Sequence, residues 1–159
     1  MSEHPSPALQ GVAECAFCRM IRGETPTPVV YQSDVAFAFL DHRPLFRGHC
    51  LVVPRRHLET LTDVPADLLG PFFAEVQLMA AAVQTAMNAQ GTFVAMNNRV
   101  SQSVPHLHVH VVPRNRRDGL RGFFWPRTRY DDADELETVR SLVERTVEAL
   151  KQAPLPDSG

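Results

Sequence analysis

The segment VPHLHVHVVPR, residues 104–114, constrains the fold more than any other part of this chain, because two kinds of residue alternate strictly within it. The aliphatic set is Leu107, Val109 and Val111, and the histidine set is His106, His108 and His110. Successive side chains of a β-strand point to opposite faces, so the aliphatic set would face a core and the histidines would share the other face. The segment therefore predicts a strand with one apolar face and one chemically active face.

Length and charge limit the classes of protein to consider. The chain has 159 residues, about the size of one domain, and its formal net charge is −2, from 16 Lys and Arg against 18 Asp and Glu. This balance gives no strong signal for a nucleic-acid partner. We see no run of about 18 apolar residues that could span a bilayer and no secretory leader, so we expect a cytoplasmic protein without a membrane partner.

Residues 1–12 and 152–159 are polar, contain proline and lack periodicity, so we expect two mobile tails around a single domain at 13–151. Alternation and β-branched or aromatic content predict five strands, at 28–34, 35–41, 49–54, 92–98 and 106–112. Helical spacing predicts one long helix, beginning near Pro71 and ending before Gly91, with Phe72, Val76, Met79 and Val83 on its apolar stripe. A second helix is expected at 133–151. This order predicts an α+β domain with a mainly antiparallel sheet.

Strand spacing limits what the three histidines can do together. Two steps along a strand cover roughly 6.7 Å, so the outer two histidines stand about 13 Å apart. Zinc binds nitrogen at about 2.0 Å, so one ion cannot bind all three without breaking the strand. A pair such as His106 and His108 could still chelate a metal together with ligands from elsewhere. A solvated polar strand face is the simplest alternative.

The cysteines favour a metal site. Cys15 and Cys18 have the two-residue gap typical of a zinc hairpin, and His57 and His106 are the best candidates for the other two ligands of a tetrahedral ion. Two buried structural thiols are the alternative. If His106 has a structural role, His108 is available as a nucleophile, because imidazole has an ordinary pKa of about 6.5 and leaves phosphorus readily. That chemistry suits phosphoryl or nucleotidyl transfer.

The chain resembles the histidine triad (HIT) family, whose motif is His-φ-His-φ-His-φ-φ with φ apolar. HLHVHVV, residues 106–112, fits this motif at every position, and the resemblance extends over nearly all of 15–130 through CAFCRMIRGETP, VAFAFLDHRPLFRGHCLVVPRRH and NNRVSQSVPHLHVHVVPR. It implies the HIT fold and a hydrolase or transferase that cleaves adenosine nucleotides, either dinucleoside polyphosphates or nucleoside phosphoramidates, at the α-phosphorus.

The resemblance also implies roles for individual residues. His108 would be the nucleophile that forms a nucleotidyl-histidine, and His110 would contact the phosphate or the leaving group. The zinc-bearing bacterial branch places its metal ligands at Cys15, Cys18, His57 and His106, and that zinc would be structural because four protein ligands leave no open position. The implied substrate contacts are Asp41 for the ribose; Phe17, Met20, Phe39 and His42 for the base; and Asn97, Gln102 and Ser103 for the phosphate and leaving group. The alternatives are turn capping for Asp41, ordinary core packing for the aromatics and, for Asn97, a polar loop whose side chains hydrogen-bond to its own backbone.

Three departures from the family pattern affect specificity. His42 stands where aliphatic residues are common, which leaves the choice of base open. The loop from Asn97 to Ser103 is short and has no glycine. The third triad position is His110 rather than glutamine, which disfavours the uridylyltransferase and dinucleoside-phosphorylase activities of related branches. His49 lies at a matched position near the active centre, and we assign it no direct role.

The segment from Arg114 to Arg129 contains six arginines around Phe123, Phe124 and Trp125. Two interpretations are consistent with this segment. It is either a solvated loop with an aromatic anchor or a clamp for additional phosphates of the substrate. Three functions thus remain: a HIT-type hydrolase, which we favour, a nucleotide-binding regulatory module with little turnover, and a metal-dependent hydrolase that uses His106 and His108 as ligands. The long helix and the strand edges also suggest a homodimer.

Overall fold

The computed structural model describes residues 15–120 and 129–152. The chain divides into two compact units, residues 1–118 and 119–159, and each is described by itself. The single domain expected at 13–151 stays a prediction, and both expected tails lie largely outside the described residues.

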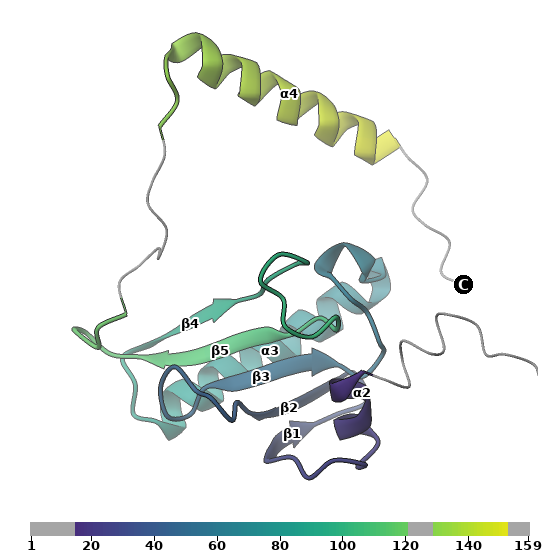
Figure 1. The fold of residues 1–159 in the computed structure, drawn as a ribbon, viewed down its shortest axis with the longest axis vertical. Coiled ribbons are helices and arrows are strands. Elements are labelled where there is room, and N and C mark those ends of the chain that lie inside the picture. The colour runs from purple at the N-terminus through teal and green to yellow at the C-terminus, as the bar shows by residue number, and fades with distance from the viewer. Residues whose placement is uncertain (1–14, 121–128, 153–159) are drawn as a thin grey trace, which may run out of the picture. The chain divides into compact units, whose positions relative to one another are not determined.

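Unit 1 contains a five-stranded antiparallel sheet, in which the spatial order is β1-β2-β3-β5-β4 (Figure 1). The strands are β1 (Val29–Gln32), β2 (Ala36–Leu40), β3 (Cys50–Pro54), β4 (Gly91–Ala95) and β5 (Val109–Arg114). This confirms the predicted α+β fold with a mainly antiparallel sheet. Strands β2 and β3 pair along their whole length, from Ala36 opposite Pro54 to Leu40 opposite Cys50.

The prediction that all three histidines lie in one strand is wrong. Strand β5 begins at Val109, so only His110 belongs to it, while His106 and His108 lie in the segment just before it. The chain leaves the sheet there because the Leu107 N–H donates to the Leu58 carbonyl at 2.6 Å instead of to a strand neighbour. The alternation of faces persists nevertheless, since Leu107 is fully buried with Val109 and Val111 in the core beside the long helix.

The long helix α3 (Ala66–Ala86) begins five residues before the predicted start at Pro71. Proline normally ends or kinks a helix in its interior. Here the first turn is secured because the N–H groups of Leu68 and Leu69 both donate to the Pro65 carbonyl, and Leu68 packs against the core. The predicted apolar stripe is confirmed, since its four members are buried: Phe72, Val76, Met79 and Val83.

Helix α3 is also long and apolar enough to cross a membrane by length and composition, contrary to the expectation that the chain has no such segment. Its buried stripe packs against β3, β4 and β5, so in this structure it is the core helix of unit 1. Its outward face carries exposed apolar side chains, among them Leu69 and Leu78.

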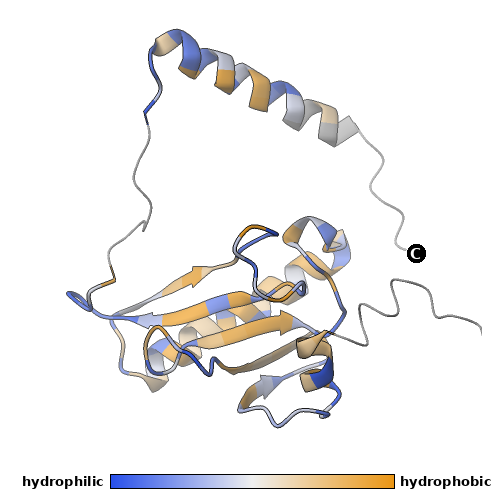
Figure 2. Ribbon diagram, in the orientation of Figure 1, coloured by the Kyte–Doolittle hydropathy of each residue, from blue (hydrophilic) through white to orange (hydrophobic). Residues whose placement is uncertain are grey.

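The sheet separates two apolar clusters, and the strands are largely hydrophobic along their length (Figure 2). On one face, Ala36, Ala38 and Val52 pack with α3. On the other face, alternate residues of the same strands pack with the short helix α2 (Ala16–Ile21), and this second cluster comprises Cys15, Phe17, Cys18, Phe37, Phe39, Leu51 and Val53. The helix α2 therefore covers the face of the sheet that also carries His110, because His110 pairs with Leu51.

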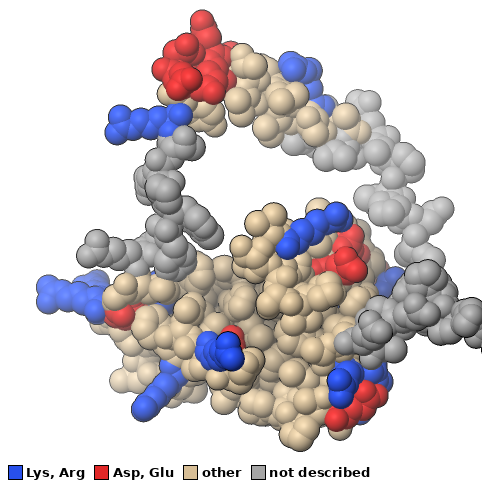
Figure 3. Space-filling model, in the orientation of Figure 1, with Lys and Arg blue, Asp and Glu red and all other residues tan. Residues whose placement is uncertain are grey.

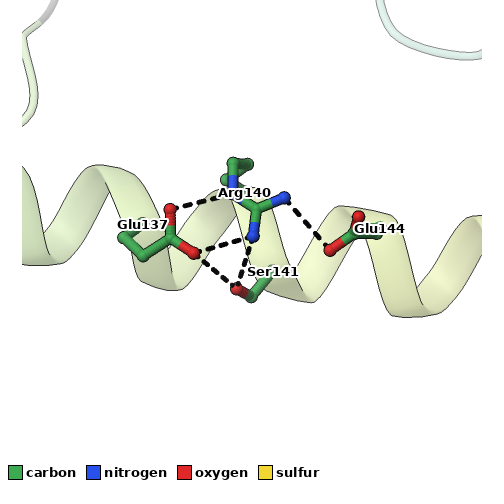
Figure 4. Close-up of polar contacts among 4 residues, drawn as sticks. All are labelled: Glu137, Arg140, Ser141 and Glu144. Atoms are coloured by element: carbon green, nitrogen blue, oxygen red, sulfur yellow. Dashed lines mark hydrogen bonds and ion pairs between the residues drawn. The ribbon is translucent and has the colours of Figure 1, made fainter.

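Unit 2 contains the helix α4 (Ala133–Gln152), which agrees with the predicted helix at 133–151 to within one residue. Its first turn is capped, since the Asp132 carboxylate accepts the N–H of Glu135 at 2.8 Å. On its surface Arg140 binds Glu137 one turn before it and Glu144 one turn after it, with Ser141 also donating to Glu137 (Figure 4). These spacings bring opposite charges together on one helix face. Leu136, Leu142 and Val143 are exposed in this unit.

Part of the arginine-rich segment lies outside the described residues, including Phe123, Phe124 and Trp125. At its start, Arg114 forms a bidentate ion pair with Asp118, with Nε–Oδ2 and Nη2–Oδ1 distances of 2.5 and 3.0 Å. On the face of unit 1 drawn in Figure 3, basic side chains of the described residues stand in small separate groups rather than in one continuous patch.

An apolar groove between α3 and β1–β3, lined by Tyr31, Leu78 and Met87 among others, lies on the α3 face and hence away from the histidines.

Candidate functional site

Four residues from three distant segments form a compact cluster on the α2 face. They are Cys15 at the start of α2, Cys18 within it, His57 after β3 and His106 before β5, and their ligand atoms all lie within 4.8 Å of one another. The Sγ of Cys15 lies 3.4 Å from Nδ1 of His106, and the Sγ of Cys18 lies 3.3 Å from Nδ1 of His57 and 3.6 Å from Nδ1 of His106. The structure thus brings together the four residues that the sequence proposed as metal ligands.

The geometry and chemistry of this cluster fit zinc. Zinc bonds of about 2.3 Å to sulfur and 2.0–2.1 Å to nitrogen at tetrahedral angles place sulfur and nitrogen about 3.6 Å apart, close to the three separations above. Burial raises the pKa of the Cys18 thiol to about 12, with the hydrogen bond and charge of Cys15 acting in the same direction. At this pKa the Cys18 thiol stays protonated at pH 7 unless a bound cation stabilises the thiolate, and a Cys₂His₂ set is a common structural zinc site.

The orientation of His106 follows from one backbone contact. Its Nε2 lies 2.9 Å from the Pro54 carbonyl, which can only accept, so Nε2 carries the proton and Nδ1 presents its lone pair to the two sulfurs. The side chain is fully buried, and burial lowers its pKa to about 4, so the ring is neutral at pH 7. A neutral ring with a free Nδ1 is what a metal ligand requires. Both ring nitrogens of His106 thus have partners other than His108, Nδ1 with the two sulfurs and Nε2 with the Pro54 carbonyl, which disfavours a catalytic metal shared by these two histidines.

His108 is held in the opposite tautomer. Its Nδ1 lies 2.7 Å from the carbonyl oxygen of His106, so Nδ1 donates, and in the neutral ring Nε2 keeps its lone pair. The Phe17 ring packs edge-on against His108 with centroids 5.3 Å apart, and it contacts His106 and Phe39 in the same way. Because Phe17 lies between the two cysteines in sequence, the cluster and the histidine ring are linked through one buried aromatic side chain.

His110 lies beside His108, with ring centroids 5.1 Å apart, and its Nδ1 is 3.0 Å from Nε2 of His49. Burial lowers the pKa of His110 to about 4, the neighbouring His108 and His49 act in the same direction, and Asp41 opposes them. Burial likewise lowers the pKa of His49. Both rings are thus neutral at pH 7 and act through hydrogen bonds rather than through charge.

Asp41 lies at the edge of this group, directly after β2. Its Oδ2 is 3.7 Å from Nδ1 of His49, while its Oδ1 accepts the N–H of Arg43 at 2.8 Å. The second contact is the turn-capping role named above as the alternative for this residue. Asp41, His49 and His110 also offer ligand atoms within 4.8 Å of one another. His49 makes hydrogen bonds through both ring nitrogens, which leaves neither nitrogen available to an ion.

The loop before the histidines is tied to its own backbone and to the segment after β3. Asn97 donates to the Ser101 carbonyl at 3.2 Å, and Gln102 accepts the Arg99 N–H and donates to the Glu59 carbonyl. Asn97 and Gln102 thus hydrogen-bond to backbone groups of the protein, as in the alternative named above for Asn97, while Ser103 is exposed. Positive φ values at Arg99 and Ser101, 67° and 60°, allow the turn without glycine.

The four residues expected around the base differ in exposure. Phe17 and Phe39 are buried in the cluster beneath α2, where they act as core. Met20 is partly buried against that cluster. The imidazole of His42 is exposed, and it lies 3.8 Å from Oδ1 of Asp41.

Sequence reasoning missed the role of His49. Only 3% of this residue is exposed, and it contacts His110 directly. The signal lies in the register of β2 and β3. Leu40 pairs with Cys50, so Asp41 and His49 are the next pair, and the Asp41 N–H donates to the His49 carbonyl at 2.9 Å. Once the register is known, Asp41 and His49 are two polar residues at adjoining strand ends on the face that carries the histidines, and this places His49 beside His110.

Comparisons with known proteins agree with this arrangement. The sequence profile described as "HIT domain" matches residues 22–117. An adenylylsulfatase of Arabidopsis thaliana is 34% identical over 67% of this chain, a match that spans 55% of that relative's own length. An adenosine 5'-monophosphoramidase of Saccharomyces cerevisiae is 32% identical over 75% of this chain and 74% of its own length.

Among solved structures, the zinc-bound histidine triad family protein of Mycobacterium smegmatis is similar, with a TM-score of 0.65 and 32% identity over 87% of this chain and 99% of that one. The profile match covers more than half of the chain, and the five-stranded sheet and the buried Cys–His cluster are consistent with it. The chain therefore belongs to the HIT family.

Proposed function

We propose that this protein hydrolyses adenosine nucleotides at the α-phosphorus through a covalent intermediate on His108. The observation that carries the proposal is the hydrogen bond from Nδ1 of His108 to the His106 carbonyl, because it leaves Nε2 as an oriented nucleophile. Relatives named as an adenylylsulfatase and as adenosine 5'-monophosphoramidases support this reaction class.

In the first step Nε2 of His108 attacks the α-phosphorus. A P–N bond forms as the bond from phosphorus to the leaving group breaks, and the leaving group departs with the bonding electron pair and takes up a proton from solvent water. In the second step water attacks phosphorus, the P–N bond breaks, and a nucleoside monophosphate and one proton are released. Imidazole suits both steps because it is nucleophilic when neutral and a good leaving group when attached to phosphorus.

Neighbouring side chains orient the substrate in this proposal. Neutral His110 donates a hydrogen bond to a phosphoryl oxygen or to the leaving group. Asp41 accepts hydrogen bonds from the ribose hydroxyls through lone pairs that its turn contact leaves available. Of the residues expected around the base, Met20 and His42 offer accessible surface, and Phe17 and Phe39 support them from the core. Gln102 and Asn97 shape the phosphate loop through backbone contacts, and exposed Ser103 contacts the leaving group.

Zinc has a structural role in this proposal. Cys15, Cys18, His57 and His106 would hold the ion, and four protein ligands leave no position for a reactive water. A bound ion would hold Cys15 and Cys18 of the α2 region to His106 before β5, and it would thereby help to fix the His106 carbonyl to which His108 donates. Its contribution is to stability and orientation rather than to bond cleavage.

A substrate panel on the purified protein tests the proposed reaction. Adenosine phosphoramidate, adenylyl sulfate and diadenosine polyphosphates of increasing length are compared, with product release as the readout and His108→Ala as the matched variant. We expect wild-type protein to release AMP from at least one of them and His108→Ala to lose about 10³-fold or more of that rate. Equal rates for the two proteins would reject the nucleophile. Tight nucleotide binding without any product would favour the alternative, a nucleotide-binding module.

We also propose a homodimer in the cytosol. Strand β4 is at the edge of the sheet with Val94 exposed, and α3 exposes Leu69 and Leu78, so both elements offer apolar surface to a second copy. Sedimentation of the wild type against Leu78→Lys tests this assembly. A dimer that the lysine converts to monomer is expected, and a monomeric wild type would contradict it.

A further inference from the structure

The ring of His49 has only one nitrogen that can donate. The backbone N–H of Leu45 donates to Nδ1 of His49 at 3.2 Å, so Nδ1 is an acceptor and the ring proton lies on Nε2. The Asp41 carboxylate lies 3.7 Å from the same nitrogen. The ring is nearly fully buried, and its backbone is fixed by the Phe46 carbonyl, which accepts the His49 N–H at 3.0 Å.

The protonated nitrogen of His49 faces His110. Nε2 of His49 and Nδ1 of His110 are 3.0 Å apart, and because His49 is the donor, Nδ1 of His110 must accept. A neutral imidazole that accepts at Nδ1 carries its proton on Nε2. A chain of two hydrogen bonds, from the Leu45 N–H through His49 to His110, thus determines which nitrogen of His110 is protonated.

Local backbone geometry explains why His49 reaches this position. Gly48 precedes it with φ +90°, and a Cβ at Gly48 would lie 2.5 Å from Cγ of Met87. The tight turn places His49 opposite Asp41, one residue beyond the last pair of β2 and β3. His110 lies on the neighbouring strand β5, opposite Leu51, so His49 and His110 are diagonal neighbours on one face.

We propose that His49 is a positioning residue that holds His110 as its Nε2–H tautomer, so that His110 presents a hydrogen-bond donor to the reacting phosphate. This role rests on the proposed function, since it assumes that a phosphate is the group that His110 contacts. Without His49 the proton of His110 could occupy either nitrogen, and the Nδ1–H form would direct a lone pair at an anionic oxygen. Because both rings are neutral at pH 7, His49 controls the tautomer of His110 and not its charge.

The titratable neighbours are consistent with this arrangement. His108 lies next to His110, and the Asp41 carboxylate lies 3.7 Å from Nδ1 of His49 and within 4.8 Å of a ring nitrogen of His110. Burial outweighs the carboxylate, so the pKa of His49 is lowered overall. A doubly protonated His49 would lose its bond from the Leu45 N–H, which is a further reason for the ring to stay neutral.

Nitrogen-15 NMR of the full chain tests the proposal directly. Long-range proton–nitrogen spectra of imidazole-labelled protein distinguish the two tautomers, and a coupling across the N–H···N bond between His49 and His110 would report the bond itself. We expect Nε2–H for both rings, with that coupling present. A wild-type His110 protonated on Nδ1 would overturn the proposal without any variant.

Two variants separate positioning from packing. His49→Leu removes the donor and should convert His110 to a mixture of tautomers, while His49→Gln restores a donor through its amide and should return the wild-type tautomer. Circular dichroism and thermal unfolding establish that each variant is folded. An unchanged His110 tautomer in folded His49→Leu would contradict the proposal. If that variant does not fold, the wild-type coupling and the His49→Gln spectrum decide.

Kinetics add a readout that a merely structural role would not change selectively. In His49→Leu we expect kcat to fall by about tenfold or more with little change in KM, because a donor to the reacting group contributes about 10²–10³-fold when fully lost. His49→Gln should stay within severalfold of the wild type. If the wild-type protein hydrolyses no substrate, the proposed function fails, and the tautomer measurements still decide the role of His49.

Discussion

The Sγ atom of Cys15 lies 3.4 Å from Nδ1 of His106, although 91 residues separate them in sequence. This contact joins the residue that caps the start of α2 to the segment that carries His108. It holds the start of α2 against the segment that enters β5, and the Phe17 ring contacts both His106 and His108. Stability of the metal cluster and orientation of His108 are therefore physically connected.

Metal removal should destabilise the protein. Purified protein is expected to hold about one zinc per chain, and chelation should lower the free energy of unfolding by an amount on the order of several kcal/mol, because binding to buried thiolates couples to folding. Metal analysis and thermal unfolding measure both effects. Cys18→Ser should lose the metal, while Cys50→Ala is the matched control, since Cys50 is a buried thiol on the α3 face of the sheet. Full metal content in Cys18→Ser would contradict the assigned site.

Truncating Phe17 should affect turnover more than stability. Phe17→Leu keeps an apolar side chain of similar volume, so we expect a loss of about 1 kcal/mol in stability. The rate should fall severalfold because the His108 ring loses its edge contact. Phe37→Leu is the control. Phe37 is buried in the same cluster and packs on Phe39, as Phe17 does, whereas it is Phe17 that contacts the His108 ring. Equal kinetic effects of the two substitutions would show that Phe17 acts only as core.

Acidification should destabilise the protein through His110. Its pKa is lowered from 6.5 to about 4, so between these values the unfolded chain binds more protons than the folded one. Stability from keeping this ring neutral is thus complete above about pH 6.5 and is lost as the pH falls toward 4. Urea unfolding at pH 7 and pH 5 measures the loss. His110→Gln should show a smaller difference between the two pH values, and an identical difference would refute the assignment.

Gly48 should tolerate no side chain. Gly48→Ala adds a Cβ that meets the Met87 side chain at 2.5 Å, and its φ of +90° is strained for any L-residue. Backbone strain alone costs about 1–2 kcal/mol. Gly23→Ala is a matched control, because Gly23 has φ +75° with nothing within 4 Å of the added atom. Thermal unfolding should show the larger loss for Gly48→Ala, and equal losses would mean that Met87 moves aside at no cost.

Most of the fold could be predicted because its signals are local. Apolar runs indicated the strands β2 and β3, which are buried on both faces, and helical spacing indicated the buried face of α3, whose residues match the predicted stripe. Element ends were less accurate. Pro71 looked like a helix start because proline disfavours helix interiors, but Leu68 packing against the core extends α3 by another turn.

The site was only partly predictable, because its contacts depend on register and on backbone carbonyls. The cysteine spacing and the histidine motif were sufficient to indicate a Cys₂His₂ cluster. By contrast, the tautomer of each histidine depends on the Pro54 carbonyl, the His106 carbonyl and the Leu45 N–H, and no sequence pattern encodes these partners. The contact between His49 and His110 was missed for the same reason.

The most direct test of the central claim is to locate the nucleotidyl group on the protein. Wild-type protein is mixed with a substrate that it hydrolyses, quenched in alkaline denaturant within milliseconds to seconds, digested and examined by mass spectrometry. We expect a nucleotidyl adduct on His108 that forms and decays at rates consistent with turnover. Steady hydrolysis with no adduct on His108, or an adduct on another residue, would contradict the account.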